Sequence, residues 1–187
     1  MGSYIVYIAI IVILMGISIF LIKKGKSKNP GDGENNNKPI ECGYISVFFD
    51  ATRNITIIPY VKNKLGVGKA ISEPRMLQSP YEANALGRLV RASMEACSNA
   101  FPGTDEELMG RLGFLKWVDF SADKKNISIH YDEKYGIVMN TTIRLKDGSY
   151  QFLTRGADMI LDKHASNGEI GEALMSLMPK CRLIPVK

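Results

Sequence analysis

The chain has 187 residues, of which 45% are apolar, a share typical of globular proteins and too high for a disordered one. Its formal net charge of +5 is unevenly spread, because five lysines outweigh two acidic residues within positions 1–40 and leave only +2 for positions 41–187. A strongly basic nucleic-acid-binding domain is therefore excluded, and no nucleic-acid partner is expected.

The segment Tyr4–Ile22 carries no charged residue and is apolar on every face. As a helix it would span about 28 Å, close to the roughly 30 Å hydrocarbon core of a bilayer. Its thirteen Ile, Val, Leu and Phe residues favour insertion by roughly 4 to 8 kcal/mol. The pattern predicts a transmembrane helix over residues 4–22.

A cleaved signal peptide is the main alternative, but it requires a positive N-terminal region and small residues at a cleavage site. Met1–Ser3 contains no Lys or Arg, and lysines follow the apolar segment instead. Myristoylation at Gly2 is disfavoured because Val6 stands where that signal needs Ser or Thr. Since the lysines lie C-terminal to the segment, the positive-inside rule predicts a single-pass membrane protein whose N-terminus lies outside and whose domain faces the cytoplasm.

Residues 23–40 are rich in Gly, Asn, Lys and Pro and offer almost nothing to a core. The chain should therefore have four parts. We expect a short extracytoplasmic tail over 1–3, the transmembrane helix over 4–22, a flexible basic linker over 23–40 and a soluble domain over 41–187.

The soluble domain opens with a predicted β-hairpin. Tyr44–Phe49 is rich in β-forming residues, and Asn54–Tyr60 has Ile at alternate positions after a polar break. A short extended stretch follows Gly66 and Gly68.

Capping boxes predict where two helices begin. The first, Ser79–Glu82, has Pro at the first helical position and opens a helix to about Ser98. The second, Thr104–Glu107, opens a short helix through Leu112. Apolar residues at helical spacing predict a last helix over Glu169–Met178.

The region between these helices is predicted to be β again. Asn126–Tyr131 alternates, Tyr135–Leu145 is a long run of β-forming residues, and Lys146–Gly148 is a turn signal before a strand over Ser149–Thr154. Strands and helices do not alternate strictly along the chain. The expected fold class is therefore α+β, with a mostly antiparallel sheet and two to three helices, preceded by one transmembrane helix.

Metal and cofactor sites are not expected. Cys42, Cys97 and Cys181 are odd in number and widely spaced, and no Cys/His ligand pair occurs, so free thiols in a reducing compartment are favoured. Gly66–Lys69 lacks the remaining spacing of a phosphate-binding loop and is better explained as a turn.

Catalytic candidates are few. His130 should lie on the strand face opposite Ile129, where it could act as a general base beside Asp132–Glu133, although a surface histidine is the favoured interpretation. His164 lies in a polar stretch and should be solvated. Asp105–Glu107 and Asp132–Glu133 could be carboxylate pairs or metal ligands, but first-turn helix charge and a hairpin turn explain them better. No catalytic residue is assigned.

Three aromatic residues are candidates for contacts with a partner. Trp117 is a residue type enriched at binding hot spots, but a core position is favoured for it. Tyr131 and Tyr135 flank a predicted tight turn and could be exposed contacts.

Three segments, Gly43–Asp50, Arg53–Pro59 and Glu73–Pro74, resemble immunity proteins of bacterial contact-dependent growth inhibition systems. The resemblance extends over Tyr44–Leu183. It implies a small, non-enzymatic α+β protein that binds and neutralises the C-terminal toxin domain of a cognate contact-delivered protein, often a nuclease. It implies no particular toxin-binding residues, because immunity surfaces diverge with their toxins.

Two features depart from that family. A transmembrane anchor is not part of its pattern, and a domain charge of +2 does not make an acidic mimic of a nucleic acid. A local acidic face formed by Asp105–Glu107, or by Asp119 and Asp123, stays open.

The sequence therefore predicts a membrane-anchored immunity protein that binds a cognate toxin domain, with no enzymatic activity and no small-molecule substrate. One alternative is a small membrane-anchored enzyme with a dispersed site built from residues such as His130, Asp132 and Arg144. Another is a generic membrane-tethered interaction module.

Overall fold

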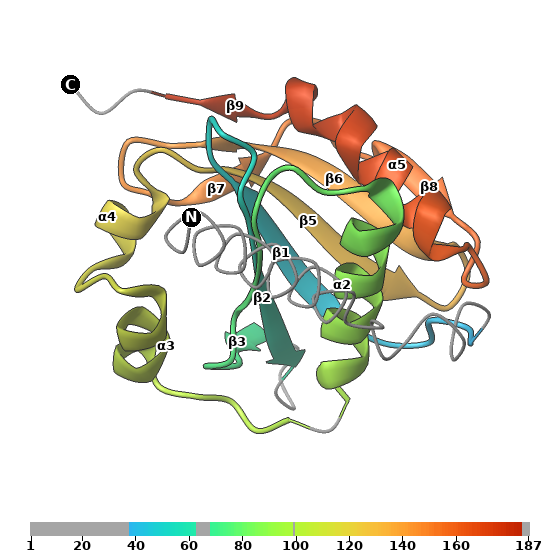
Figure 1. Ribbon diagram of the computed structural model, residues 1–187, viewed down its shortest axis with the longest axis horizontal. Coiled ribbons are helices and arrows are strands. Elements are labelled where there is room, and N and C mark those ends of the chain that lie inside the picture. Colours follow the sequence, from blue (N-terminus) through green and yellow to red (C-terminus); the bar gives the residue numbers. More distant parts are fainter. Residues whose placement is uncertain (1–37, 63–67, 99, 185–187) are drawn as a thin grey trace, which may run out of the picture. The chain divides into compact units, whose positions relative to one another are not determined.

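Two antiparallel hairpins form the centre of the β-sheet in the computed structural model, which describes residues 38–62, 68–98 and 100–184 (Figure 1). The strands are β1 Tyr44–Phe49, β2 Ile55–Lys62, β3 Gly68–Ala70, β4 Arg75–Leu77, β5 Lys125–Asp132, β6 Gly136–Arg144, β7 Tyr150–Phe152, β8 Met159–Leu161 and β9 Arg182–Leu183. The helices are α2 Ala83–Ala96, α3 Asp105–Leu112, α4 Trp117–Ser121, α5 Asn167–Leu177 and the 3₁₀ turn η1 Met178–Lys180.

The strands of the described part make one sheet in the order β3-β2-β1-β5-β6-β7. β4 also pairs with β2, while β8 and β9 pair with β6. Every pairing is antiparallel except that of β9, which runs parallel to β6. The predicted α+β class with a mostly antiparallel sheet is confirmed.

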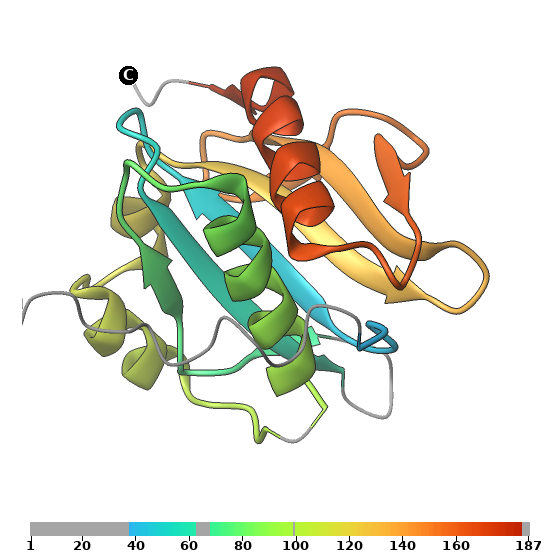
Figure 2. The same cartoon turned by 45° about the vertical axis from the view of Figure 1, so that its right-hand side comes forward.

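Helices α2 and α5 lie side by side on one face of the sheet, which we call the core face (Figure 2). Ile45 and Val47 of β1 and Ile127 and Ile129 of β5 point into this layer, where all four are fully buried, so the alternation predicted over residues 126–131 is confirmed. The main hydrophobic core therefore lies between the sheet and these two helices.

Two glycines allow α2 and α5 to approach closely. A Cβ on Gly87 would stand 1.8 Å from the carbonyl oxygen of Asn167, and one on Gly171 would stand 1.8 Å from that of Ala83. No side chain fits at such a distance. Beside this contact the buried Arg91 donates to Asn167 Oδ1 at 2.8 Å and to the Ala165 carbonyl, so it ties α2 to the start of α5.

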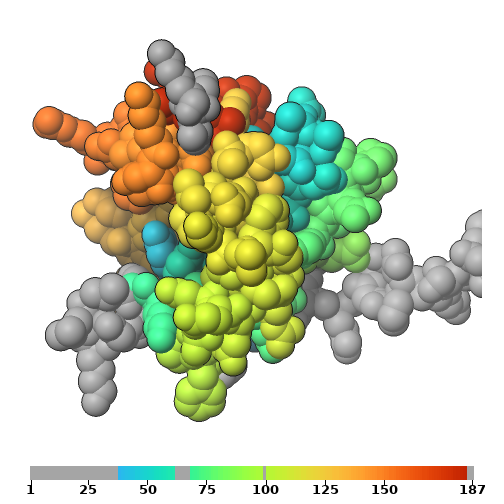
Figure 3. Space-filling model, turned by 90° about the vertical axis from the view of Figure 1, so that its left-hand side faces the viewer, coloured from blue at the N-terminus to red at the C-terminus, as the bar shows by residue number. Residues whose placement is uncertain are grey.

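The opposite face of the sheet is covered by α3 and α4 over part of its area. Phe48 of β1 is the centre of an aromatic cluster there and makes edge contacts with Trp117, Phe120 and Tyr150 at 5.3 to 5.5 Å between ring centroids. The preferred core position for Trp117 is confirmed: it is half-buried and donates from Nε1 to the Gly148 carbonyl at 3.0 Å. Figure 3, which looks onto this side, shows a hollow between the yellow α4 segment and the orange segment around β7.

The helix predictions need three corrections. The described residues contain four α-helices and a 3₁₀ turn rather than two to three helices, because α4 is too short for a periodic signal. The Ser79–Glu82 capping box is wrong, since α2 begins at Ala83 with Glu82 as N-cap and no side-chain cap bond. The last helix begins at Asn167 and ends at Leu177, with a capping box formed by Ser166 and Glu169.

Other local predictions are confirmed. Thr104 and Glu107 form both bonds of a capping box, and α3 ends at Leu112 before Gly113 in the left-handed conformation. The turn at Lys146–Gly148 joins β6 to β7. Lys69 lies in β3 opposite Val61 rather than in a turn, while residues 66 and 67 lie outside the described residues.

The predicted anchor over residues 4–22 also lies outside the described residues. Within the part of the chain that the structure describes, no helix has both the length and the apolar character to cross a membrane.

Candidate interaction site

Arg144 lies far from the other residues of the enzyme alternative. His130 pairs with Val138, whereas Arg144 stands six residues further along β6, which is about 20 Å in an extended strand. Arg144 is completely buried and donates to Ser121 Oγ and the Val118 carbonyl, so it attaches α4 to β6. Asp132 accepts the backbone N–H groups of Lys134 and Tyr135, as a hairpin turn requires.

The remaining candidate residues from the sequence are exposed to solvent or partly buried at the edge of the fold. His130 is half-buried on the face opposite Ile129, as predicted, and His164 is exposed. Tyr135 is half-exposed and Tyr131 packs at the edge of the core. Among residues 38–62, 68–98 and 100–184, no three His, Cys, Asp or Glu side chains are arranged to hold a metal ion.

The three cysteines are free thiols. Cys181 is buried, and burial raises the pKa of its thiol to about 11. Burial also raises the pKa of Cys97, whose Sγ lies 3.5 Å from the Tyr44 carbonyl oxygen. Such thiols are protonated at neutral pH and poor nucleophiles.

A polar row crosses the sheet on the face opposite the core helices. Ser46, Ser128 and Asn140 lie in register on β1, β5 and β6, and each is less than 9% exposed. Asn140 donates to the Gly156 carbonyl at 2.8 Å, but the Ser128 hydroxyl has no hydrogen-bond partner among the residues that the structure describes. Along β5, the isoleucines face the core helices and the polar residues between them face the opposite side of the sheet, where this row lies.

One surface groove lies between α3 and α4 and has a volume of about 430 Å³. Asp105 and Glu106 line one side of it, and Leu115, which is 95% exposed, and Trp117 line the other. The acidic face predicted from Asp105–Glu107 therefore adjoins an apolar surface. Glu107 itself is engaged in the cap of α3, where hydrogen bonds from Thr104 lower its pKa.

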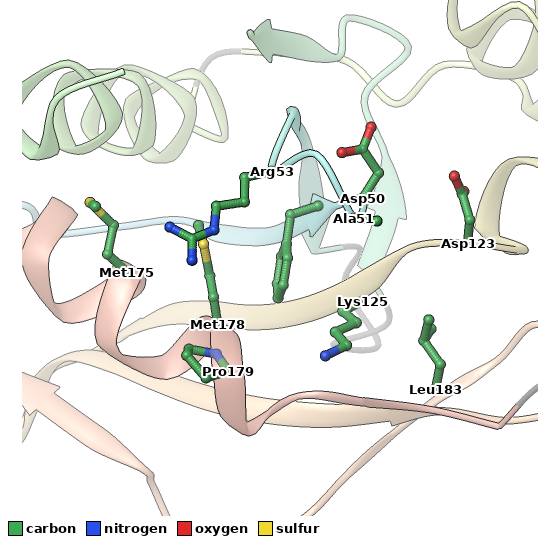
Figure 4. A pocket seen from close by; sticks show the side chains of 10 residues that line it. Asp50, Ala51, Arg53, Asp123, Lys125, Met175, Met178, Pro179 and Leu183 are labelled. Carbon is green, nitrogen blue, oxygen red and sulfur yellow. The ribbon is translucent and has the colours of Figure 1, made fainter. Parts of the chain in front are cut away.

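A second groove, which we call the loop groove, lies where the β1–β2 loop meets α5 and η1. Two adjoining cavities of about 320 and 180 Å³ share Arg53, Met175 and Met178 in their walls. The larger is lined by Phe49, Asp50, Ala51, Arg53, Asp123, Lys125, Met175, Met178, Pro179 and Leu183 (Figure 4). It thus combines residues from four separate parts of the chain.

The β1–β2 loop holds Arg53 in an unusual conformation. Arg53 has φ = 66°, in the left-handed region that non-glycine residues rarely adopt. Its N–H donates to the Asp50 carbonyl at 3.0 Å, and its own carbonyl accepts from the Tyr81 hydroxyl at 2.9 Å. Backbone strain of this kind tends to occur at functional sites, where the surroundings enforce it.

The two carboxylates of the loop groove are already engaged. Asp50 accepts from Thr52 Oγ1 at 2.7 Å and from the backbone and side-chain amides of Asn54. Burial opposes ionisation of Asp50, but these hydrogen bonds together outweigh it and hold its pKa below the usual value. Asp123 forms an ion pair with Lys124 at 2.9 Å.

Arg53 and Lys125, the two cations of the loop groove, differ in this respect from the two carboxylates. Neither the Arg53 guanidinium nor the Lys125 ammonium has a hydrogen-bond or ion-pair partner among the residues that the structure describes. The Arg53 side chain extends from the loop toward Met175 and Met178, while the Asp50 carboxylate points away from it (Figure 4). Met175 is 38% exposed on α5.

Sequence reasoning did not identify this groove. Arg53 appeared only within a resemblance segment, and Asp123 only as part of an acidic face. Lys125 carried no signal, and Met175 and Met178 entered only as part of the predicted last helix. The run Asp50–Asn54 did predict a polar break, but nothing local indicates that it meets α5.

No protein-family model matches this chain, and no curated protein does. Among solved structures it is similar to a protein of unknown function, NMB0488 from Neisseria meningitidis, with a TM-score of 0.58 and 15% identity over 78% of this chain and 98% of that one. It is also similar to a chain of the CdiA-CT/CdiI toxin and immunity complex from Yersinia pseudotuberculosis, with a TM-score of 0.57 and 17% identity over 77% of this chain and 99% of that one. At these identities the likeness shows a shared fold, which is that of a chain in a toxin–immunity complex.

Proposed function

We propose that this chain is an immunity protein that binds the toxin domain of a contact-dependent growth inhibition system and blocks it stoichiometrically. The fold shared with a chain of the Yersinia pseudotuberculosis complex is the observation that carries this proposal. The sequence resemblance supports it, because Gly43–Asp50 and Arg53–Pro59 form β1 and most of β2, at the centre of the shared sheet.

Inhibition by binding also suits what the surface offers. The described residues form two surface grooves with exposed apolar side chains. Exposed apolar surface beside charged groups is typical of protein interaction sites. The partner would therefore be a folded protein domain rather than a small molecule.

The test is co-expression with the C-terminal domain of the contact-delivered protein encoded beside this chain. We expect growth to be restored and a 1:1 complex to form, while a toxin domain from an unrelated system is neither bound nor neutralised. Continued growth arrest without complex formation would refute the proposal. Arrest caused by this chain alone would assign it the toxin role instead.

Stoichiometry separates inhibition from the enzyme alternative. A binding inhibitor should abolish toxin activity in vitro only at about one equivalent, because each molecule occludes one active site. Full inactivation of the toxin by a small fraction of an equivalent would instead indicate turnover.

The proposal includes membrane anchoring. Residues 4–22 would hold the domain at the cytoplasmic face of the inner membrane, with residues 23–40 as the tether. Tethering would raise the concentration of the inhibitor where an incoming toxin first appears. Fractionation with protease protection tests this: we expect the domain in the membrane fraction and cleavable only from the cytoplasmic side.

A further inference from the structure

We infer that the loop groove is the docking site for an acidic segment of the toxin domain, with a carboxylate on Arg53 and Lys125 and an apolar side chain on Met175 and Met178. This inference rests on the proposed function, since it names the surface and the partner chemistry through which neutralisation would occur.

Charge complementarity selects an acidic partner. The carboxylates of Asp50 and Asp123 already have partners, so they are poor acceptors for an incoming cation. The Arg53 and Lys125 side chains are the groups that still have donors to offer within the described groove. A partner carboxylate would complete charge-assisted hydrogen bonds, which are about twice as strong as neutral ones.

The methionines indicate a segment of a protein rather than a free anion. Met175 and Met178 line both cavities; Met175 is 38% exposed and Met178 is 6% exposed. Methionine adapts its shape to irregular apolar partners, and such residues occur on surfaces that bind protein segments. An inorganic anion would leave this apolar surface uncovered.

The loop conformation prepares Arg53 for this contact. Hydrogen bonds at the Arg53 backbone and the Asp50 network fix the loop before any partner arrives. Less ordering is then required on binding, which strengthens an interaction without adding contacts. The left-handed φ of Arg53 costs conformational free energy locally, and the surrounding fold holds the residue in this conformation.

The experiment measures the affinity of the full chain, held in detergent, for a catalytically inactive form of the toxin domain encoded beside it. Arg53→Glu and Lys125→Glu should each weaken binding by roughly 10- to 100-fold. Lys134→Glu is the matched control, because Lys134 lies beyond the opposite end of β5 and should change affinity less than about threefold.

Arg53→Gly separates binding from folding. Glycine accepts φ = 66° without strain, so this variant should unfold at the same or a higher urea concentration than the wild type while binding at least about tenfold more weakly. Substituting the toxin's Asp and Glu residues by Lys, one at a time, should identify a position that restores binding to Arg53→Glu.

Methionine oxidation provides a second readout on the complex. Peroxide should oxidise Met175 in the free chain but not in the complex, whereas Met76, which is 54% exposed on β4, should remain reactive in both. If the wild type does not bind, the proposed function itself fails. If it binds but the groove variants bind equally well, or Met76 is protected in place of Met175, only the docking site is overturned.

Discussion

The close contact between α2 and α5 predicts that a Gly→Ala substitution, which usually stabilises a helix, destabilises this protein. Gly87→Ala adds a methyl group 1.8 Å from the Asn167 carbonyl oxygen. Real Cβ atoms essentially never approach below 3.0 Å, so the helices would have to separate by at least 1.2 Å. The same movement would break the 2.8 Å bond between Arg91 and Asn167.

The magnitude follows from three contributions. Overpacking costs about 1–3 kcal/mol, and an unsatisfied buried group costs about 1–3 kcal/mol more. Alanine recovers about 1 kcal/mol through its higher helix propensity. We therefore expect Gly87→Ala to lower the free energy of unfolding by roughly 1–5 kcal/mol, which can be a large part of the stability of a domain of this size.

The assay is urea unfolding of the full chain in mild detergent, followed by the fluorescence of Trp117, the only tryptophan. Gly110→Ala in α3 is the matched control, because no atom lies within 4 Å of the added Cβ and the chain should gain about 0.5–1 kcal/mol. If Gly87→Ala is as stable as the wild type, or stabilises as Gly110→Ala does, the close helix contact is wrong.

Three further predictions concern buried or hydrogen-bonded groups. Ser128→Ala should raise the free energy of unfolding by about 1 kcal/mol in the same assay, because it removes a buried hydroxyl that has no hydrogen-bond partner within the described part of the chain. A decrease in the free energy of unfolding would mean that the hydroxyl is hydrogen-bonded. Burial opposes ionisation of Asp158, but hydrogen bonds from Thr141 outweigh this effect and lower the pKa of the carboxyl group. The ionised Asp158 therefore stabilises the fold at pH values above the pKa it has in the unfolded chain. This stabilisation is lost as pH falls through its pKa in the folded chain. Acid titration of stability below about pH 5 should therefore be shallower in Asp158→Asn than in the wild type, and equal slopes would contradict this. Iodoacetamide at pH 8 should alkylate the half-buried Cys42 well before Cys181, whose pKa is about 11, as followed by mass spectrometry; equal rates in the folded chain would argue against the burial of Cys181.

Features that depend on neighbouring residues could be predicted from the sequence. Ile at alternate positions predicts β2 and β5, one strand of each central hairpin, because the period of a strand is two residues. The Thr104–Glu107 capping box forms as predicted because both of its bonds lie within one helical turn. The short strands β4, β8 and β9 have two or three residues each and carry no periodic signal.

The failed capping box shows where local rules lose to tertiary contacts. The Ser79 N–H donates to Asn54 Oδ1, 25 positions away, and the Tyr81 hydroxyl donates to the Arg53 carbonyl. These bonds attach the segment to the β1–β2 loop, so the helix starts only at Ala83. The loop groove escaped prediction for the same reason, because Arg53 and Met175 are brought together only by the complete fold.

The arrangement of charge in the loop groove also bears on specificity. A domain charge of +2 supplies little long-range attraction for an acidic partner, so discrimination must arise from local geometry. Asp50 and Asp123 line the same cavity as Arg53 and Lys125. A carboxylate that reaches the two cations without approaching the two anions gains both hydrogen bonds, whereas one displaced toward Asp50 or Asp123 meets like charge. If the proposed docking site is correct, these carboxylates would reject misplaced acidic segments, and a toxin with a different spacing would be excluded by repulsion as well as by lost contacts.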